Sequence, residues 1–372
     1  LARILQGEVA DGAVFYGGKG QEARVAGVST LMGQTPNKVA KASAGDTVTL
    51  GRLDNMATGE TISTTKGSTA QLAEVAKPAG VYGLALSVQD RKDEVKLTSA
   101  IGKLIEEDPS LHLEHNHDTH EMVLWGQGEM HLRVALEKLN RKYGVVVQSS
   151  ARQVPYKETI RRSVEVRGRH KKQSGGHGQF GDVKVEIKPL PRGAGFQFSE
   201  TITGGVVPRQ FIPSVEIGVA DYLQHGPLGG FPVVDVGVTL TDGSYHAVDS
   251  SDMAFRQAGR LAMSEGLPKC DPVLLEPIME VEIAVPNDAT ARVNGMIPQR
   301  RGHILGFDAR EGWPGWDIIR AQLPETEMAD LIVELRSATA GVGTFSARFD
   351  HLAELTGRLA DTVLTQQRQA AE

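Results

Sequence analysis

The stretch that decides the fold is RRSVEVRGRHKKQSGGHGQFGDVKVEIKPL, residues Arg161–Leu190. Both of its ends alternate apolar and polar residues, a pattern typical of β-strands that bury one face. Between them, Lys171–Asp182 interleaves polar residues and Phe180 with four glycines, Gly175, Gly176, Gly178 and Gly181. Glycine permits positive φ and close backbone approach, while serine, histidine and glutamine form hydrogen bonds. The run therefore predicts a hairpin connection that acts as a contact loop.

Basic residues precede the glycine run. Residues 161–172 hold six of them, Arg161, Arg162, Arg167, Arg169, Lys171 and Lys172, against the single acidic residue Glu165. Such an excess of positive charge favours a polyanionic partner. The alternative is an ordinary hairpin whose basic residues form the solvated face of a strand. These residues alone leave both interpretations open.

A second polar stretch, TDGSYHAVDSSDMAF, ends at Phe255. It follows the β-rich run Val233–Leu240 and begins with a turn at Asp242-Gly243, after which Asp249 and Ser250 are candidate caps for a helix over Ser251–Gly266. Another helix is predicted over Phe211–Leu223, with Pro213 in its first turn. Both polar loops should therefore emerge at the same end of one layer of strands and helices.

Together these two stretches resemble the tip loops of the fourth domain of bacterial elongation factor G, the translational GTPase that promotes translocation on the ribosome. The resemblance covers essentially the whole chain. The other segments that carry it are RQVPYKETIRRSVEV (152–166), GGVVPRQFIPSVEIGV (204–219), WGQGEMHLRVALEKL (125–139), DPVLLEPIMEVEIAVP (271–286) and QRRGHILG (299–306).

The resemblance implies a multidomain α+β fold. The expected parts are a small β-barrel over 1–65, cut at its N-terminal end, a linker over 66–77, a ferredoxin-like split βαβ domain over 78–151, a ribosomal protein S5 domain 2-like α/β domain over 152–272, a second ferredoxin-like domain over 273–350 and a C-terminal helix over 351–372. The chain begins at Leu1 without an initiator methionine. We therefore expect a fragment of a longer protein, with the GTPase domain removed.

Hydrophobic periodicity supports the two split βαβ patterns. In the first, apolar residues recur at helical spacing from Leu97 until Asp108-Pro109, and a hairpin follows around residues 116–118. In the second, a strand over Ile278–Val285 precedes two short helices, the first of which Asn287 or Asp288 could cap. A final helix is predicted from the spacing of Leu352, Leu355, Leu359 and Val363.

The resemblance also implies the residues that contact RNA. In the first loop these are Ser174, Gly175, Gly176, His177, Gly178, Gln179, Phe180 and Gly181, and in the second they are Ser244, Tyr245, His246, Asp249 and Ser250. His246 is the strongest candidate, in a contact role rather than a catalytic one. His177 and Asp182 stand where the family usually has arginine and histidine. We therefore expect weaker phosphate contact and added repulsion at Asp182.

Arg300 and Arg301 form a second candidate contact. In the family the corresponding domain approaches RNA of the large ribosomal subunit. The alternative is a solvated helix end, where cations favour the helix dipole. We expect no catalytic residue, no cofactor site and no metal site in the chain. The histidines His112, His115, His117 and His120 are dense enough to suggest zinc, but a polar turn is the better account, since alternate residues of a hairpin point to opposite faces.

The composition limits how the chain can bind RNA and where in the cell it can act. The chain has 372 residues and a net charge of −6, so RNA binding has to come from local patches. One cysteine, Cys270, excludes an internal disulfide, and we expect it to be buried. No apolar run is long enough to span a membrane. These features predict a cytoplasmic protein, and we expect it to be a monomer.

No segment has the G-x-x-x-x-G-K-[ST] pattern that cradles nucleotide phosphates. The resemblance implies that GTP and Mg²⁺ bind in a missing N-terminal domain, so this chain alone should not hydrolyse GTP. The implied partners are the 70S ribosome, ribosomal RNA and the tRNA–mRNA pair of the decoding region. The alternatives are ribosome disassembly, a ribosomal-protection factor, and a small-molecule kinase that holds a nucleotide at SGGHGQFG.

Overall fold

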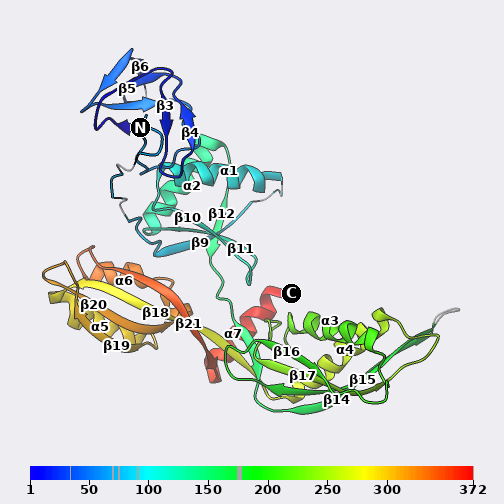
Figure 1. Ribbon diagram of the computed structural model, residues 1–372. Coiled ribbons are helices and arrows are strands. Elements are labelled where there is room, and N and C mark those ends of the chain that lie inside the picture. Colours follow the sequence, from blue (N-terminus) through cyan, green and yellow to red (C-terminus); the bar gives the residue numbers. More distant parts are fainter. Residues whose placement is uncertain are drawn as a thin grey trace. The chain divides into compact units, whose positions relative to one another are not determined.

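The structure is a computed structural model, and it describes residues 1–33, 35–68, 71–73, 76–88, 90, 92–173 and 178–371 (Figure 1). The chain forms two compact units. The first comprises Leu1–His115 and Met122–Ser150, and the second comprises Asn116–Glu121 and Ala151–Glu372. Both are built from several small sheets and from helices, which confirms the predicted multidomain mixed fold.

Short strands build the N-terminal part of the first unit. Four of them form a sheet in the order β1 (Ala2–Arg3), β8 (Thr47–Leu50), β5 (Val28–Met32), β6 (Thr35–Lys38). The others form two pairs, β2 (Glu8–Ala10) with β7 (Lys41–Ser43), and β3 (Val14–Tyr16) with β4 (Glu22–Arg24). Their common core includes Val9, Val25, Val28, Ala42 and Val48.

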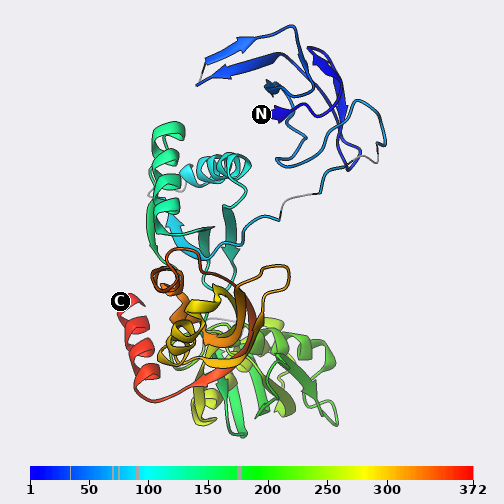
Figure 2. The same ribbon diagram turned by 90° about the vertical axis from the view of Figure 1, so that its left-hand side faces the viewer.

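The described strands of this region do not close into the expected barrel. They are two to five residues long and remain separate ladders, drawn in blue in Figure 2. Glycines with positive φ follow or precede these strands, namely Gly7, Gly12, Gly20, Gly27 and Gly45. Because other residues rarely adopt such φ values, these positions turn the chain before a ladder can lengthen. Residues 66–77, the expected linker, contain no helix or strand in their described part.

The rest of the first unit has the split βαβ order that the sequence predicts. Its elements are β9 (Tyr82–Ser87), α1 (Lys92–Glu107), β10 (His112–Asn116), β11 (Glu121–Gly126), α2 (Glu129–Tyr143) and β12 (Gln148–Ala151), with the sheet order β10-β11-β9-β12. Helix α1 ends immediately before Asp108-Pro109, as expected. Leu97, Ile101, Leu104, Leu132 and Leu139 bury the helices against the sheet.

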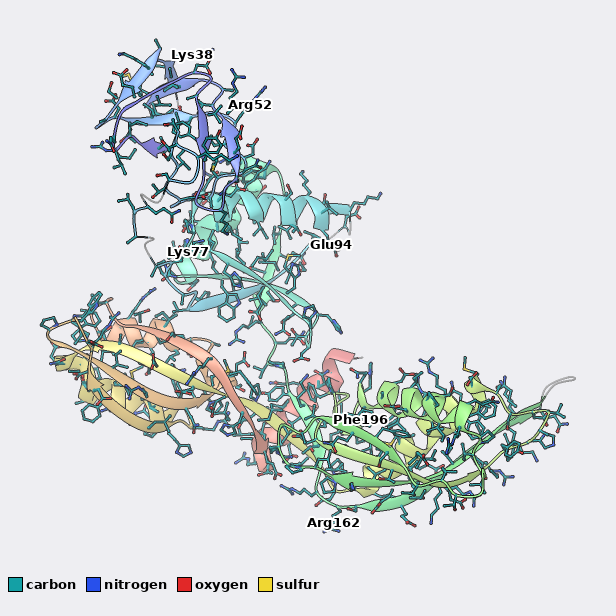
Figure 3. The ribbon with its side chains drawn as sticks, viewed as in Figure 1. Lys38, Arg52, Lys77, Glu94, Arg162 and Phe196 are labelled. Atoms are coloured by element: carbon teal, nitrogen blue, oxygen red, sulfur yellow. The ribbon has the colours of Figure 1, made fainter. Side chains whose placement is uncertain are left out.

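The second unit contains the sheet that carries the glycine-rich hairpin. Its order is β14 (Val164–Gln173), β15 (Gly178–Pro189), β17 (Val236–Ser244) and β16 (Phe196–Glu200). The helices α3 (Ile212–Leu223) and α4 (Asp252–Gly266) cover one face of it, and the short 3₁₀ helices η1 (Arg209–Phe211) and η2 (Leu267–Lys269) flank them (Figure 1). In Figure 3, Arg162 and Phe196 mark the end of this sheet opposite the hairpin.

A second sheet in this unit follows the order β13 (Lys157–Ile160), β18 (Pro272–Pro286), β20 (Trp316–Pro324), β19 (His303–Ala309), and β21 (Thr344–Leu355) also pairs with β18. Its helices are α5 (Thr290–Gln299) and α6 (Leu331–Ala338), each preceded by a 3₁₀ turn, η3 (Asn287–Ala289) or η4 (Glu325–Met328). Helix α7 (Gly357–Ala371) follows β21. In the described residues, no helix is long and apolar enough to cross a membrane.

Four local predictions in this unit are wrong. Asp242 and Gly243 form no turn, because both lie in β17, where they pair with Lys184 and Val183 of β15. The final helix does not include Leu352 and Leu355, because both lie in β21, where Leu355 pairs with Leu274. Gly357, at φ 67°, separates that strand from α7. Asn287 and Asp288 both belong to the 3₁₀ turn before α5, and neither side chain caps that helix. The cap of α4 is Ser251, whose side chain accepts a hydrogen bond from the Ala254 amide, because Asp249 and Ser250 bond elsewhere.

Strand β13 joins the two sheets of this unit, a feature that sequence patterns did not indicate. Its residues pair with the start of β18, while Glu158 also bridges to Val233 beside the first sheet. The buried carboxylate of Glu158 accepts hydrogen bonds from the backbone N–H groups of Leu228, Gly229 and Phe231. The loop that contains Leu228, Gly229 and Phe231 is therefore held by a single side chain from β13.

Candidate functional site

The glycine-rich hairpin joins β14 to β15, as predicted. Ser174, Gly175, Gly176 and His177 lie outside the described residues. On the β15 side, Gly178, Gln179, Phe180 and Gly181 continue the ladder, with Gly178 opposite Gln173 and Phe180 opposite Lys171. The Oε1 atom of Gln179 lies 2.9 Å from the Nε2 atom of His170 across the pair. The described part of the first loop is thus regular strand rather than irregular loop.

The second polar loop, Ser244–Ser250, is bonded directly to the hairpin. The Phe180 amide donates to the carbonyl oxygen of Asp249 at 2.8 Å. The Ser250 hydroxyl donates to the carbonyl oxygen of Phe180 at 2.9 Å and accepts from the His246 amide at 2.9 Å. The Gly178 amide donates to the Asp249 carboxylate at 3.2 Å. The structure therefore brings the two predicted loops together at one end of the sheet.

His246 holds its own loop through one ring nitrogen. Its Nδ1 atom accepts hydrogen bonds from the amides of Asp249 and Val248, at 3.2 and 3.4 Å. An accepting Nδ1 leaves the proton of the neutral ring on Nε2. The same Nδ1 atom lies 3.2 Å from Oδ2 of Asp249. The side chain is 56% exposed, so Nε2–H is available to an external acceptor.

Aromatic rings and a cation gather next to His246. The ring of Phe180 lies 6.4 Å from the His246 ring in an edge-on arrangement, and the Arg169 guanidinium lies 5.4 Å above Phe180. Tyr245, which precedes His246 in the same loop, is half exposed. A guanidinium over an aromatic face is a favourable contact that also orders the arginine. The site thus presents ordered hydrogen-bonding, aromatic and cationic groups together.

The glycines of the described hairpin serve packing. A Cβ atom at Gly181 would lie 2.6 Å from the carbonyl oxygen of Ala254 in α4, and one at Gly168, farther down β14, would lie 2.2 Å from that of Ala258. A Cβ atom at Gly178 would lie within 3 Å of the Asp249 carboxylate. These glycines therefore let α4 and the second loop lie flat on the strands, so the close backbone approach that glycine permits is made here within the protein.

Asp182 has a different role from the one expected. Its carboxylate accepts two hydrogen bonds from Arg167 and one from the Ser244 hydroxyl, each at 2.8 Å, and its side chain is 3% exposed. Burial by itself raises the pKa of the Asp182 carboxyl, but the bonds from Arg167 and Ser244 outweigh it and hold the pKa below its usual value. The expected repulsion of RNA by Asp182 has no geometric basis here.

Arg300 and Arg301 bond within the protein. The Arg301 guanidinium donates to both carboxylate oxygens of the buried Glu276, at 2.7 and 2.9 Å, and to Glu327 at 2.9 Å. Hydrogen bonds from Arg301 to these two carboxylates raise its pKa. The Arg300 side chain is 12% exposed and pairs with Asp330 and Glu334. Both arginines are therefore paired with carboxylates of the same domain.

The hairpin histidines and Cys270 were the remaining candidates for metal binding or reactivity. Among the described residues, no group of three or more histidine, cysteine, aspartate or glutamate side chains is arranged to hold a metal ion, the hairpin histidines included. Cys270 is fully buried, as predicted, and burial raises the pKa of its thiol to about 11. A thiol with this pKa is protonated at neutral pH and unreactive.

Three family descriptions match consecutive parts of the chain. "Elongation Factor G, domain III" matches residues 77–151, "Elongation factor G, domain IV" matches 152–271, and "Elongation factor G C-terminus" matches 273–363. The hairpin, His246 and Asp182 lie in the second match, and Arg300 and Arg301 lie in the third.

Similar proteins span the whole chain. It is 54% identical over 360 residues to an elongation factor G-like protein of Synechocystis and 40% identical over 364 residues to elongation factor G of Aquifex pyrophilus. Each match covers 97% of this chain but only 53% and 51% of the relatives. A crystal structure of a Thermus thermophilus protein aligns with a TM-score of 0.81 and 35% identity, over 98% of this chain and 54% of the other. The chain therefore belongs to the elongation factor G family and carries its third, fourth and C-terminal domains.

Proposed function

We propose that this chain is the ribosome-binding part of an elongation factor G-like translational GTPase, and that it promotes movement of tRNA and mRNA on the 70S ribosome. The observation that carries the proposal is the cross-bonded tip, in which the Phe180 strand and the His246 loop are held together by backbone and serine hydrogen bonds. Membership of the family supplies the ribosome as the partner.

The chemistry of the tip suits ribosomal RNA and the tRNA–mRNA pair of the decoding region. Nε2–H of His246 is a donor for a phosphate, sugar or base acceptor, and the amide side chain of the exposed Gln179 offers both a donor and an acceptor. Arg169, Lys171 and Lys172 line the same hairpin and are exposed, so they supply the positive charge that phosphate contact needs. These residues form the proposed RNA contact, together with Tyr245 and residues 174–177 of the first loop.

GTP and Mg²⁺ belong, in this proposal, to a part of the intact protein that these 372 residues do not include. The relatives are about twice as long as the matched region, and no phosphate-cradling motif occurs in the sequence. Hydrolysis would then act on the tip only through the domains between them. The proposed setting is the cytoplasm, where ribosomes translate.

Co-sedimentation of the chain with bacterial ribosomes over a salt series tests the proposal. We expect binding that weakens as salt rises, and about fivefold weaker binding for His246→Ala and for Gln179→Ala, since each removes one hydrogen-bonding group worth about 1 kcal/mol. Lys188→Ala is the control, because this exposed lysine lies at the opposite end of β15. Equal binding by all four proteins would exclude a tip contact, and salt-independent binding would exclude RNA phosphates.

A further inference from the structure

Asp182 links three strands directly below the tip. It lies opposite Arg169 on β14 and opposite Ser244 on β17 in the strand register. Its carboxylate joins Arg167 of β14 to Ser244 of β17 through the bidentate pair and the hydroxyl bond described above. Charge-assisted bonds of this geometry are among the strong hydrogen bonds of proteins. The carboxylate therefore fixes the last residue of β17.

The His246 loop is consequently anchored at both of its ends. Ser244 binds Asp182 at the beginning of the loop, and Asp249 and Ser250 bind Gly178 and Phe180 at its end. β17 also approaches β15 closely at the first anchor, where a Cβ atom at Gly243 would lie 2.4 Å from the carbonyl oxygen of Asp182. Loss of either anchor would let the outward direction of Nε2 vary.

The buried position of Asp182 also separates this role from an electrostatic one. Its oxygens face the Arg167 guanidinium, so the negative charge is neutralised inside the sheet. By contrast, Glu165 on the same face is 56% exposed and pairs with Lys184 at 2.7 Å. A carboxylate that repelled RNA would need the exposure of Glu165 rather than that of Asp182.

We propose that Asp182 is a positioning residue for the RNA contact, which acts by holding Ser244 and thereby the orientation of the His246 loop. This inference rests on the proposed function for its consequence in binding, but the positioning itself is a property of the chain alone. For Asp182→Asn, positioning and electrostatic repulsion predict changes of opposite sign in the affinity for ribosomes. Asp182→Asn removes one negative charge and yet weakens ribosome binding.

Two measurements on the full 372-residue chain test the proposal. In co-sedimentation, Asp182→Asn should bind about fivefold more weakly with an unchanged salt slope, because it lowers the population of the binding-competent loop and removes no phosphate contact. In hydrogen exchange, the amides of His246, Asp249 and Ser250 should exchange about tenfold faster, since one lost anchor makes local opening easier. Ser244→Ala should give the same pattern while the Asp182–Arg167 pair stays intact.

Glu165→Gln is the matched control, since it removes an exposed carboxylate from the same face, and it should leave both readouts unchanged. If Asp182→Asn bound ribosomes more tightly and with a steeper salt slope, the result would contradict the positioning role and support repulsion of RNA by the Asp182 charge. Unchanged exchange in both Asp182→Asn and Ser244→Ala would overturn the positioning role. If exchange accelerates while no protein, the parent included, binds ribosomes, then the positioning role stands and the proposed function fails.

Discussion

The tip of the fourth domain and the Arg300–Arg301 turn of the C-terminal domain look alike in sequence, since both are polar and were predicted to contact RNA. In the structure they differ. His246 is 56% exposed, and within the described residues its hydrogen bonds run through Nδ1, whereas the Arg300 side chain is 12% exposed and pairs with two carboxylates. The difference teaches that a polar residue type shows what a group could bind, while partners distant in sequence decide whether it is free.

The largest expected effect tests the turn. Arg301→Ala leaves the buried Glu276 carboxylate without its bidentate partner, so we expect a loss of about 3 kcal/mol in the free energy of unfolding of the C-terminal domain. Urea denaturation followed by the fluorescence of Trp313 and Trp316 in that domain measures it. Arg348→Ala is the control, because its pair with Glu280 is 76% exposed on the arginine side and should contribute little to the free energy of unfolding. Similar losses of unfolding free energy in Arg301→Ala and Arg348→Ala would contradict the structural role of the Arg301 pair.

Gly181→Ala probes the tip from its packed side. Its Cβ atom would clash with the backbone of α4, so we expect a loss of about 2 kcal/mol in the stability of the fourth domain. Denaturant unfolding followed by far-UV circular dichroism provides the measurement. Gly102→Ala is the matched control in helix α1, where no heavy atom lies within 4 Å, and it should stabilise by up to about 1 kcal/mol. If Gly181→Ala left the stability unchanged, the result would contradict the packing role of Gly181 and favour contact with RNA.

The pH dependence of stability tests whether Asp182 is paired. Its folded-state pKa lies below the ordinary value of 3.8, so its contribution is present above that value and is lost as pH falls through the folded pKa. We expect Asp182→Asn to be less stable than the parent by about 1.5 kcal/mol at pH 6. The gap should narrow below pH 3.8. Urea unfolding of both proteins from pH 6 to pH 2.5 measures the gap, and a constant difference would show that the carboxylate charge is not involved.

His246→Asn gives the smallest expected change in stability and sharpens the comparison most. An asparagine oxygen can accept from backbone amides two and three residues ahead, as Nδ1 of His246 does, but it lacks the outward Nε2–H. We expect the unfolding free energy to change by less than about 0.5 kcal/mol, as for other exposed positions. Ribosome co-sedimentation should nevertheless weaken as in His246→Ala. Retained affinity in His246→Asn would show that loop shape, not the outward donor, carries the contact.

The sequence allowed prediction of the elements with strong local patterns. Helix α3 begins one residue after the predicted start, with Pro213 in its first turn, and α1 stops at Asp108-Pro109 as expected. Periodicity and proline geometry are local properties, so no distant partner is needed to read them. The proximity of the two loops was also predictable, because both adjoin strand ends of the same layer.

What could not be predicted depends on partners far apart in the chain. Glu276 precedes Arg301 by 25 residues and Glu327 follows it by 26, and nothing in the local pattern marks these three as a network. Asp182 looked like an added negative charge because Arg167 and Ser244 reach it only across strand pairings. Leu352 and Leu355 are three residues apart, which fits a helix face better than strand alternation, and pairing with β18 nevertheless places both in a strand.

Strand β13 has a consequence for how the protein is made. Lys157 pairs with Leu275, so the partner of β13 emerges from the ribosome more than 100 residues later. At the usual pace of synthesis this corresponds to a wait of roughly 10 s. The sheet that carries the tip can assemble during that time, but the strand at its base stays without its neighbour. The fourth domain thus begins to fold first and is completed only when the last domain arrives.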